Sequence, residues 1–262
     1  MRQLKSSHQD LREFTLKRIT AQHIAESLTS FDTAADAQSA RQVLEQNSFD
    51  VAGAREDGQV IGYINCSDLT GGTVGDHRVD FSEEDVLSAS TPLADVLKQI
   101  RASERTFVEV LGHVGGIVTR GDLQKMPVRL WLFGLISLLE MQMLRLIREH
   151  LTEKQWANLL TDQRRQAAEE LFGKRMKNNS EIDLADCLQL CDKKNIFAAT
   201  PALLELTGFD SKTSFRNTLE ETEELRNNLA HSQDILGDEW ESLIDLAGEI
   251  EDLLERLEGA RD

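Results

Sequence analysis

The chain has 262 residues and a formal net charge of −17. This length allows two domains with cores of their own, and the negative charge argues against a broad electrostatic attraction to nucleic acid. Residues 1–127 carry 13 Lys/Arg and 19 Asp/Glu, whereas residues 128–262 carry 16 and 27, so the second half is the more acidic. A polyanion would therefore have to bind at a local cationic cluster.

The sequence does not predict a membrane span, a secretion signal or a metal site. There is no run of 18 or more apolar residues, so no membrane span is expected, and the first residues lead into charged sequence rather than an apolar signal region. The three cysteines, an odd number, do not make a disulfide framework. Cys187 and Cys191 have no second pair and no nearby histidine, so we interpret them as packing residues and expect no metal. A cytoplasmic location is the prediction.

The first half shows helical and strand-like apolar patterns that alternate in two copies. Asp68 and Asp122, which close the two copies, lie 54 residues apart, and this indicates an internal repeat. Each copy is predicted to contain one helix and two strands: residues 35–46, 49–54 and 60–64 in the first copy, and residues 93–100, 107–111 and 116–119 in the second.

The ends of the two copies resemble the closing signature of cystathionine-β-synthase-type (CBS) domains. The second copy ends in Gly-Ile-Val-Thr-Arg-Gly-Asp-Leu (residues 116–123), and the first has the weaker match Gly-Tyr-Ile-Asn-Cys-Ser-Asp-Leu (residues 62–69). Such domains occur in tandem and commonly bind adenine nucleotides as regulatory modules. The resemblance implies a tandem pair of such domains over residues 20–126, preceded by an N-terminal segment of residues 1–19. The two repeats of the pair cover about residues 20–70 and 83–126.

The CBS resemblance implies that Thr119 and Asp122 face the phosphate and the ribose of a regulatory adenine nucleotide. A carboxylate at a strand–helix junction can accept hydrogen bonds from both ribose hydroxyls, while Thr119 and the helix N-terminus receive phosphate. The first copy departs from the family pattern, because Asn65 stands where threonine or serine is expected. Thr119 and Asp122 would also serve simply to cap the following helix, and this alternative stays open.

Pro127 marks a change in character, because no strand-like alternation follows it. Residues 129–151 are apolar on nearly all sides, which predicts a helix buried between partners. We therefore expect residues 128–262 to form an antiparallel helical bundle, and the whole chain to be a multidomain α+β protein. The further helices are predicted over residues 153–173, 181–192 with a continuation to about 206, 211–231 and 237–257.

The penultimate predicted helix places Arg226, Asn227 and His231 within six residues. Arg226 lies at the edge of the apolar face, where a permanent positive charge is costly unless an anionic group meets it. Glu140, inside the long apolar helix, needs a partner for the same reason. A Glu140–Arg226 ion pair would be a structural contact, whereas an external anion at Arg226 would make this segment a site.

A helical bundle with Arg-x4-His near the end of its penultimate helix resembles the HEPN superfamily. The hallmark of that superfamily is Arg-x4–6-His, often with Asn, Asp or His directly after the arginine, and the resemblance covers about residues 128–257. It implies a homodimer in which two motifs face one cleft and cleave RNA without a metal. Toxins, phage-defence factors and RNA-processing enzymes belong to this class, and a toxin would have a neutralising partner protein.

The chemistry implied by the HEPN resemblance suits these three side chains. His231 would act as general base or acid for attack of the ribose 2′-OH, Arg226 would stabilise the charge on phosphorus, and Asn227 would orient a phosphate oxygen or His231. Nucleotide binding near Asp122 would regulate the reaction through the long helix that begins at Val128. The alternative is a non-catalytic nucleotide-sensing and dimerisation module, in which Arg226 and His231 are helix-end contacts.

Overall fold

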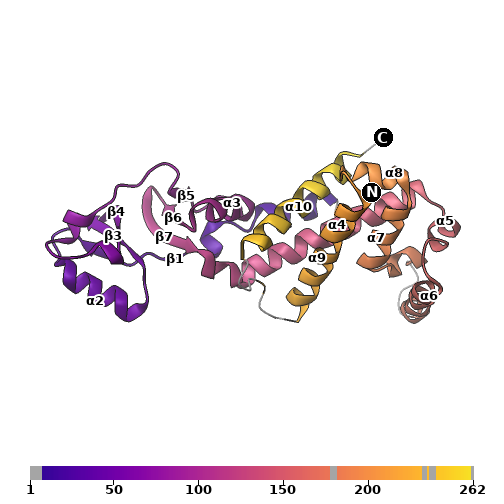
Figure 1. Cartoon of the computed structure of the whole chain (residues 1–262), viewed down its shortest axis with the longest axis horizontal. Helices are drawn as coiled ribbons and strands as arrows, with labels where there is room; N and C mark the ends of the chain where they lie inside the picture. Colours follow the sequence, from indigo (N-terminus) through magenta and orange to yellow (C-terminus); the bar gives the residue numbers. More distant parts are fainter. Residues whose placement is uncertain (1–7, 178–181, 232–234, 236–239, 261–262) are drawn as a thin grey trace, which may run out of the picture. The chain divides into compact units, whose positions relative to one another are not determined.

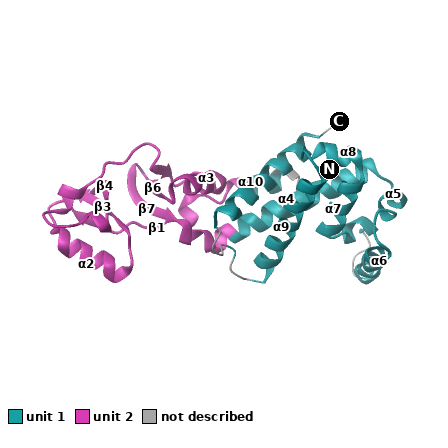
Figure 2. Ribbon diagram, viewed as in Figure 1, with its two compact units in different colours: residues 1–15, 129–262 teal, residues 16–128 magenta. Residues whose placement is uncertain are grey.

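The computed structural model describes residues 8–177, 182–231, 235 and 240–260, and it divides into two compact units (Figures 1 and 2). One unit comprises residues 16–128 and contains every strand assigned in the described residues. The other unit comprises residues 1–15 and 129–262, and the regular elements described in it are helices. The chain is therefore an α+β protein.

The unit of residues 16–128 contains two copies of a strand–helix–strand–strand order, of which the sequence predicts the helix and the two strands after it but not the first strand. In each copy the first strand runs parallel to the second, and the second and third strands are antiparallel. The first copy contains β2 (Ser30–Asp32), α2 (Ala37–Asn47), β3 (Val51–Glu56) and β4 (Gln59–Asn65), and the second contains β5 (Val86–Ser88), α3 (Leu93–Ser103), β6 (Arg105–Val110) and β7 (His113–Thr119).

The predicted period of 54 residues is confirmed in the strands. β3 and β4 coincide with β6 and β7 when 54 is added to each residue number. The turns inside the two hairpins also coincide, because Asp57 and Gly58 have φ of 49° and 80°, and Leu111 and Gly112 have φ of 53° and 84°. Two consecutive residues at positive φ match the turn that joins antiparallel strands with the least splaying. The repeat is thus conserved in the backbone even where the residue types differ.

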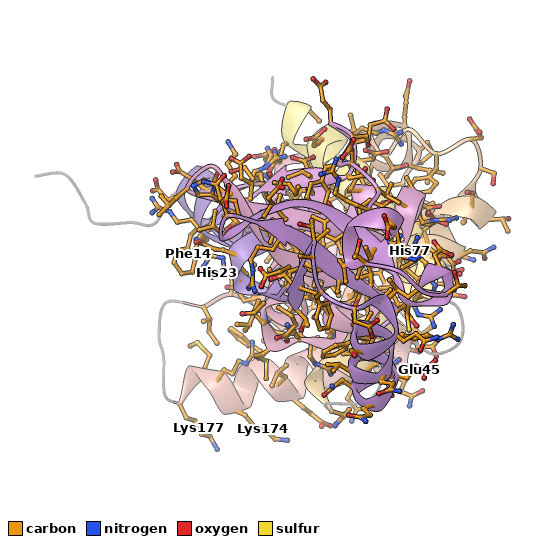
Figure 3. All side chains as sticks on the ribbon, turned by 90° about the vertical axis from the view of Figure 1, so that its left-hand side faces the viewer. Phe14, His23, Glu45, His77, Lys174 and Lys177 are labelled. Atoms are coloured by element: carbon orange, nitrogen blue, oxygen red, sulfur yellow. The ribbon has the colours of Figure 1, made fainter. Side chains whose placement is uncertain are left out.

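The segment that precedes each copy pairs with a strand of the other copy. β1 (Glu26–Ser27) precedes the first copy but pairs with β7 of the second, which gives a sheet of order β1-β7-β6-β5. Conversely, Val79 precedes the second copy but bridges Tyr63 of the first, whose sheet has the order β2-β3-β4. His23 and His77, labelled in Figure 3, lie on the short 3₁₀ helices of these two segments. The two copies are therefore interlocked.

Each repeat helix covers its own sheet with a regular apolar face. In α3 the four predicted apolar positions are buried at i, i+3, i+4 and i+7 spacing, as expected of a helix that packs on one side. In α2 the same role falls mainly to small residues, with Leu44 as the large buried side chain. The buried residues of α3 are Leu93, Val96, Leu97 and Ile100.

The helical unit is built on the long central helix α4 (Met126–His150). Among the later helices, α7 packs against both α8 and α9, and α9 packs against α10. Arg12 of α1 (His8–Arg12) forms ion pairs with Glu255, at 2.9 Å, and with Glu258 of α10. The remaining helices are α5 (Glu153–Ala157), α6 (Asp162–Met176), η6 (Leu184–Cys187), α7 (Leu190–Ala199), α8 (Pro201–Leu206), α9 (Lys212–Ala230) and α10 (Trp240–Gly259).

By length and composition, α4 is the one helix in the described part of the chain that could cross a membrane. In this structure 56% of its most apolar window is buried inside the protein. Trp131, Leu135 and Leu139 are at most 1% exposed, so this face of α4 forms the centre of the helical unit. The predicted burial of the long apolar helix is confirmed for this face, but it does not extend to all sides. Three apolar side chains of α4 are 58%, 49% and 45% exposed: Leu130, Phe133 and Met141.

The prediction of a single helix over residues 153–173 is wrong, because α5 and α6 are separate helices. Residues 158–161 break the helix, and Thr161 starts the next one by accepting a hydrogen bond from the Arg164 amide at 3.3 Å. Threonine at this position satisfies one of the amides that a new helix leaves without a partner. The apolar period continues through the break, so the pattern alone does not reveal it.

The prediction of one helix continuing from residue 181 to 206 is also wrong. The structure has η6, α7 and α8 here. Thr200 is extended at φ −110° and ψ 104°, because the ring of Pro201 excludes the helical conformation for the residue before it. Residues 181 and 237–239, where two predicted helices begin, lie outside the described residues.

Candidate functional site

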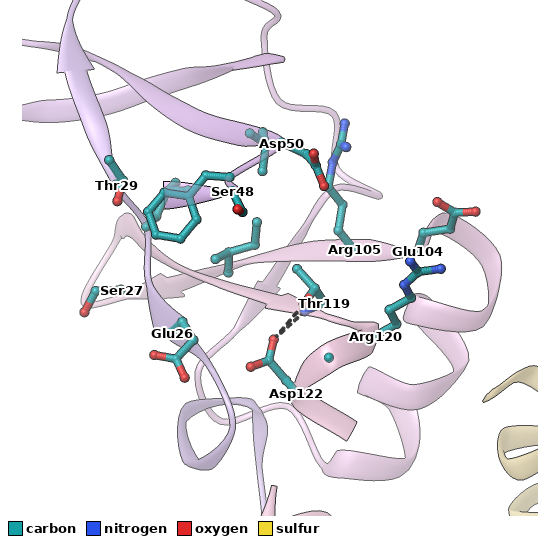
Figure 4. A pocket seen from close by; sticks show the side chains of 15 residues that line it. Glu26, Ser27, Thr29, Ser48, Asp50, Glu104, Arg105, Thr119, Arg120 and Asp122 are labelled. Carbon is teal, nitrogen blue, oxygen red and sulfur yellow. Dashed lines mark hydrogen bonds between the residues drawn. The ribbon is translucent and has the colours of Figure 1, made fainter. Parts of the chain in front are cut away.

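A pocket of about 640 Å³ lies in the unit of residues 16–128 and draws its walls from both copies of the repeat (Figure 4). Pockets that hold small organic ligands have volumes of about 300–1,000 Å³. Four chain segments meet here: β1 and the residues after it, the connection from α2 to β3, the connection from α3 to β6, and the end of β7 with the junction after it. The lining residues are 26–29, 48–51, 104–105, 117 and 119–122.

Thr119 and Asp122, the two predicted nucleotide ligands, both lie in the wall of this pocket. β7 ends at Thr119, and the 3₁₀ helix η5 (Arg120–Gln124) follows at once. Asp122 Oδ2 accepts hydrogen bonds from the Thr119 amide at 2.7 Å and from Thr119 Oγ1 at 3.1 Å. The capping interaction that the sequence left open is therefore present, and it holds the Asp122 carboxylate in place at the pocket wall.

Lys125 fixes the other oxygen of the same carboxylate. Its Nζ lies 2.8 Å from Asp122 Oδ1, donates to the Ile24 carbonyl at 2.6 Å, and forms an ion pair with Glu26. Burial on its own would lower the pKa of Lys125, but the hydrogen bonds to Asp122 and Glu26 outweigh it and raise the pKa. Lys125 thus remains charged and ties the segment before β1 to the junction after β7.

Charged side chains of both signs line the pocket. Arg105 and Arg120 are the two cationic lining residues, and Figure 4 shows Arg105 extending away from Thr119 and Asp122. The Arg105 guanidinium instead donates to Asn65 Oδ1 at 3.0 Å. Of the two guanidiniums, Arg120 belongs to the junction itself, since it lies between Thr119 and Asp122 in the sequence.

The equivalent positions of the first copy are Asn65 and Asp68. Asn65 Nδ2 donates to Asp68 Oδ2 at 2.9 Å, so the asparagine reproduces the contact made by the Thr119 hydroxyl in the second copy. This hydrogen bond, together with one from Ser67, lowers the pKa of Asp68. Neither Asn65 nor Asp68 lines the pocket described above.

The segment Arg226 to His231 forms the last turns of α9 in the helical unit. Arg226 Nη1 lies 3.3 Å from Glu140 Oε1, and its Nη2 donates to Asn227 Oδ1 at 3.3 Å. Lys193 of α7 lies 2.6 Å from Glu140 Oε2, and its side chain is only 6% exposed. The Glu140–Arg226 ion pair considered from the sequence is thus present, and a second cation shares the same carboxylate.

His231 lies at the C-terminal cap of α9, with an exposed side chain. Its amide donates to the Asn227 carbonyl at 3.1 Å. Because α-helical residues advance about 100° each, five residues turn His231 roughly 140° away from Arg226 on the helix. A single copy of α9 therefore presents Arg226 and His231 in different directions.

Arg129 adds a guanidinium to the same helix end. Its Nη2 donates to the Asn228 carbonyl at 3.2 Å and to the Leu229 carbonyl at 3.5 Å. A cation at a helix C-terminus satisfies carbonyls that have no partner inside the helix and interacts favourably with the helix dipole. Arg129, Arg226 and Lys193 thus place three cations along the last turns of α9.

Sequence reasoning missed Lys125, Arg129 and Lys193. Only Lys125 left a local signal, since it lies three residues after Asp122 beside the predicted junction. For the cysteines, burial raises the pKa of both Cys187 and Cys191, which keeps the thiols protonated. No group of three or more His, Cys, Asp or Glu side chains within the described ranges is placed to hold a metal ion.

No family model matches the chain, and no curated protein matches it either. Among solved structures, CBSX2 in complex with AMP has 20% identity and a TM-score of 0.36, covering 40% of this chain and 92% of its own. The CBS domain of the bacterial CNNM/CorC family Mg2+ transporter in complex with ATP has 14% identity and a TM-score of 0.37, covering 44% and 91%.

A CBS domain-containing protein of unknown function from Bacillus anthracis str. Ames Ancestor has 14% identity and a TM-score of 0.38, covering 42% of this chain and 94% of its own. These neighbours are CBS-domain proteins that cover about two fifths of this chain. Residues 16–128 of this chain contain duplicated strands with matching turns.

Proposed function

We propose that residues 16–128 form a regulatory module that binds an adenine nucleotide in the pocket beside Thr119 and Asp122. The observation that carries the proposal is the placement of the capped Thr119–Asp122 junction in the wall of a pocket of about 640 Å³. In the proposed complex the carboxylate held by Lys125 accepts hydrogen bonds from the two ribose hydroxyls, and Arg120 receives the phosphate. The Thr119 hydroxyl, which has one proton to donate, turns from Asp122 Oδ2 to the phosphate when the nucleotide binds.

The charges of the pocket favour a nucleotide with few phosphates. The carboxylates that line it outnumber the guanidiniums, so each additional phosphate adds repulsion as well as attraction. AMP is therefore expected to bind more tightly than ATP. The lining carboxylates are Glu26, Asp50, Glu104 and Asp122, and the guanidiniums are Arg105 and Arg120.

Substitution of Asp122 tests the nucleotide site. Asp122→Ala should weaken AMP binding by roughly 10- to 150-fold, the value of one hydrogen bond to a charged group, and should abolish the thermal shift caused by AMP. Asp122→Asn keeps an oxygen that accepts from the Thr119 amide, so this variant separates loss of binding from loss of the cap. The measurements are isothermal titration calorimetry and thermal shift with AMP, ATP, NAD and cyclic AMP.

The matched control for Asp122 is Asp68→Ala, which removes the equivalent carboxylate of the first copy. Asp68 does not line the pocket, so its loss should leave AMP affinity unchanged. Equal AMP binding by the wild type, Asp122→Ala and Asp122→Asn would contradict the proposed site. Absence of a shift with all four nucleotides would contradict nucleotide sensing altogether.

A second function is favoured by the cations at the end of α9. We infer that the helical unit is a metal-independent HEPN-type endoribonuclease that acts as a homodimer at a cleft containing Arg226 and His231 of both copies. Lys193 and Arg226 share the single carboxylate of Glu140, which leaves one positive charge in excess. That excess is a local attraction for a phosphodiester in an otherwise acidic protein.

The cleavage reaction needs two proton transfers, and a dimer supplies two imidazoles. One His231 accepts the proton of the 2′-OH while the 2′-oxygen bonds to phosphorus, and the other donates a proton to the departing 5′-oxygen. The products are a 2′,3′-cyclic phosphate and a free 5′-OH, and Arg226 offsets the charge on the phosphoryl oxygens. Arg226 and His231 point in directions roughly 140° apart on one helix, and this is a reason why two copies are required.

A further inference from the structure

The duplicated fold predicts a second nucleotide site, related to the pocket by the period of 54 residues. Thr119 and Asp122 of the pocket correspond to Asn65 and Asp68 of the first copy. Asp122 and Asp68 are each the third residue of a 3₁₀ helix that follows a strand. Asp122 Oδ2 accepts from the amide and the hydroxyl of Thr119, whereas Asp68 Oδ2 accepts from Asn65 Nδ2 at 2.9 Å. The position of the carboxylate therefore gives no reason for one site to be absent.

Side chains of the protein itself gather beside Asn65. The rings of Tyr63, Phe81 and Phe107 contact one another, with centroid separations of 5.8 Å, 5.1 Å and 4.8 Å. The Arg105 guanidinium lies over the Tyr63 ring at 5.4 Å from its centroid and donates to Asn65 Oδ1. Aromatic pairs and a cation over a ring are favourable contacts in addition to the apolar area that they bury.

The residues that correspond to this aromatic cluster are smaller in the second copy. Ile117 corresponds to Tyr63, Val51 to Arg105 and Gly53 to Phe107, at 54 residues in each case. The counterpart of Phe81 is Leu28, because these residues stand two positions after the strand partners of Tyr63 and Ile117. Leu28, Val51 and Ile117 all line the open pocket.

We propose that Tyr63, Phe81, Phe107 and Arg105 fill the first of the two symmetry-related sites, so that each chain binds one adenine nucleotide, at the second. This inference rests on the proposed nucleotide-binding function and fixes its stoichiometry. The filled site has aromatic rings at the positions where the open site has aliphatic side chains or glycine. Arg105, which is held on Tyr63 and Asn65, completes the closure.

The test counts sites on the full chain, with AMP as the probe. Calorimetry of the wild type should give one AMP per chain, and Asp68→Ala should not change that number. The double variant Tyr63→Ile/Phe81→Leu introduces the residues that the second copy already uses and should bind two. Two AMP per wild-type chain, or one per folded double-variant chain, would overturn the closure of the first site.

A spectroscopic readout covers the case in which the double variant does not fold. Tyr63 is the only tyrosine of the chain, so ¹³C-tyrosine labelling gives one NMR signal that reports on this cluster. Phe81→Leu should move that signal, and AMP should then shift it further, whereas AMP should leave the wild-type signal in place. A Tyr63 signal that is insensitive to Phe81→Leu overturns the closure, whereas a wild type that binds no AMP by calorimetry refutes the proposed function itself.

Discussion

Purified protein with His231→Ala should cleave RNA at least about 100-fold more slowly than the wild type, within the range of 10²- to 10⁴-fold that general acid–base groups contribute. The imidazole lies exposed at the C-terminal end of α9, where a substrate can reach it. The assay is cleavage of single-stranded RNA in EDTA, with detection of 2′,3′-cyclic phosphate ends. The fold should be unaffected, because the contact of His231 with α9 is made by its backbone amide.

His150→Ala is the matched control for His231. His150 is likewise an exposed histidine at the C-terminal end of a helix, α4, and it lies outside the proposed cleft residues. Its loss should leave the rate unchanged. Equal cleavage by the wild type, His231→Ala and Arg226→Ala would point to a contaminating nuclease and contradict the enzyme.

Arg226→Ala extends the same test to phosphate stabilisation. The loss should be about 10²- to 10³-fold, the effect of removing one group that stabilises a developing negative charge. Lys193 continues to neutralise Glu140 at 2.6 Å when Arg226 is gone, so this variant should remain folded. Arg226→Lys keeps the charge but not the two-pronged geometry and should recover only part of the rate.

The same variants separate the enzyme from a non-catalytic sensing and dimerisation module. If the helical unit only assembles, the AMP thermal shift persists in all variants and no RNA is cut. If it cleaves RNA, expression in growing cells should arrest growth, and His231→Ala should relieve the arrest. Growth arrest by His231→Ala equal to that of the wild type would contradict cleavage as its cause.

Local patterns predicted the repeat because its signals are short in range. The alternation of strands, the helical spacing of Leu93 to Ile100 and the junctions at Asp68 and Asp122 are each visible within about ten residues. The same reasoning failed at residues 158–161 and at Thr200, where the apolar period continues across a break. There a cap or a proline decides the outcome, and a single residue outweighs the period.

Partners from distant parts of the chain could not be predicted in this way. Asn65 gave reason to doubt the first nucleotide site, but nothing local places Phe81 and Phe107 against Tyr63. Likewise, the sequence indicated that Glu140 and Arg226 need partners and suggested that they pair. It gave no sign that Lys193, in the short helix α7, also pairs with Glu140. Burial creates the demand for a partner, and only the fold determines which residue meets it.

A buried charge is costly without a partner, and for this reason we expect the largest loss of stability from substitution of Asp192 in α7. Its side chain is 1% exposed, and both carboxylate oxygens accept from Arg164, at 2.8 Å each, while Oδ2 also accepts from the Gln189 amide at 2.9 Å. Asp192→Ala removes the anionic partner of the Arg164 guanidinium, leaves it only the hydrogen bond to Gln189 Oε1 at 2.9 Å, and opens the cap of α7. It should lower the free energy of unfolding by about 3–5 kcal/mol, the usual effect of removing one member of a buried ion pair.

Urea unfolding followed by circular dichroism measures this loss, and Asp162→Ala is the matched control. Asp162 pairs with Arg165 at 2.9 Å, close to the 2.8 Å of the Asp192–Arg164 pair, but the Asp162 side chain is 95% exposed. Exposed pairs contribute about 0.2–1 kcal/mol, so the control should lose little. Equal losses at the two positions would mean that burial does not set the value of the Arg164–Asp192 pair. A large loss at Asp192 alone would show that this contact between α6 and α7 holds the helical unit together.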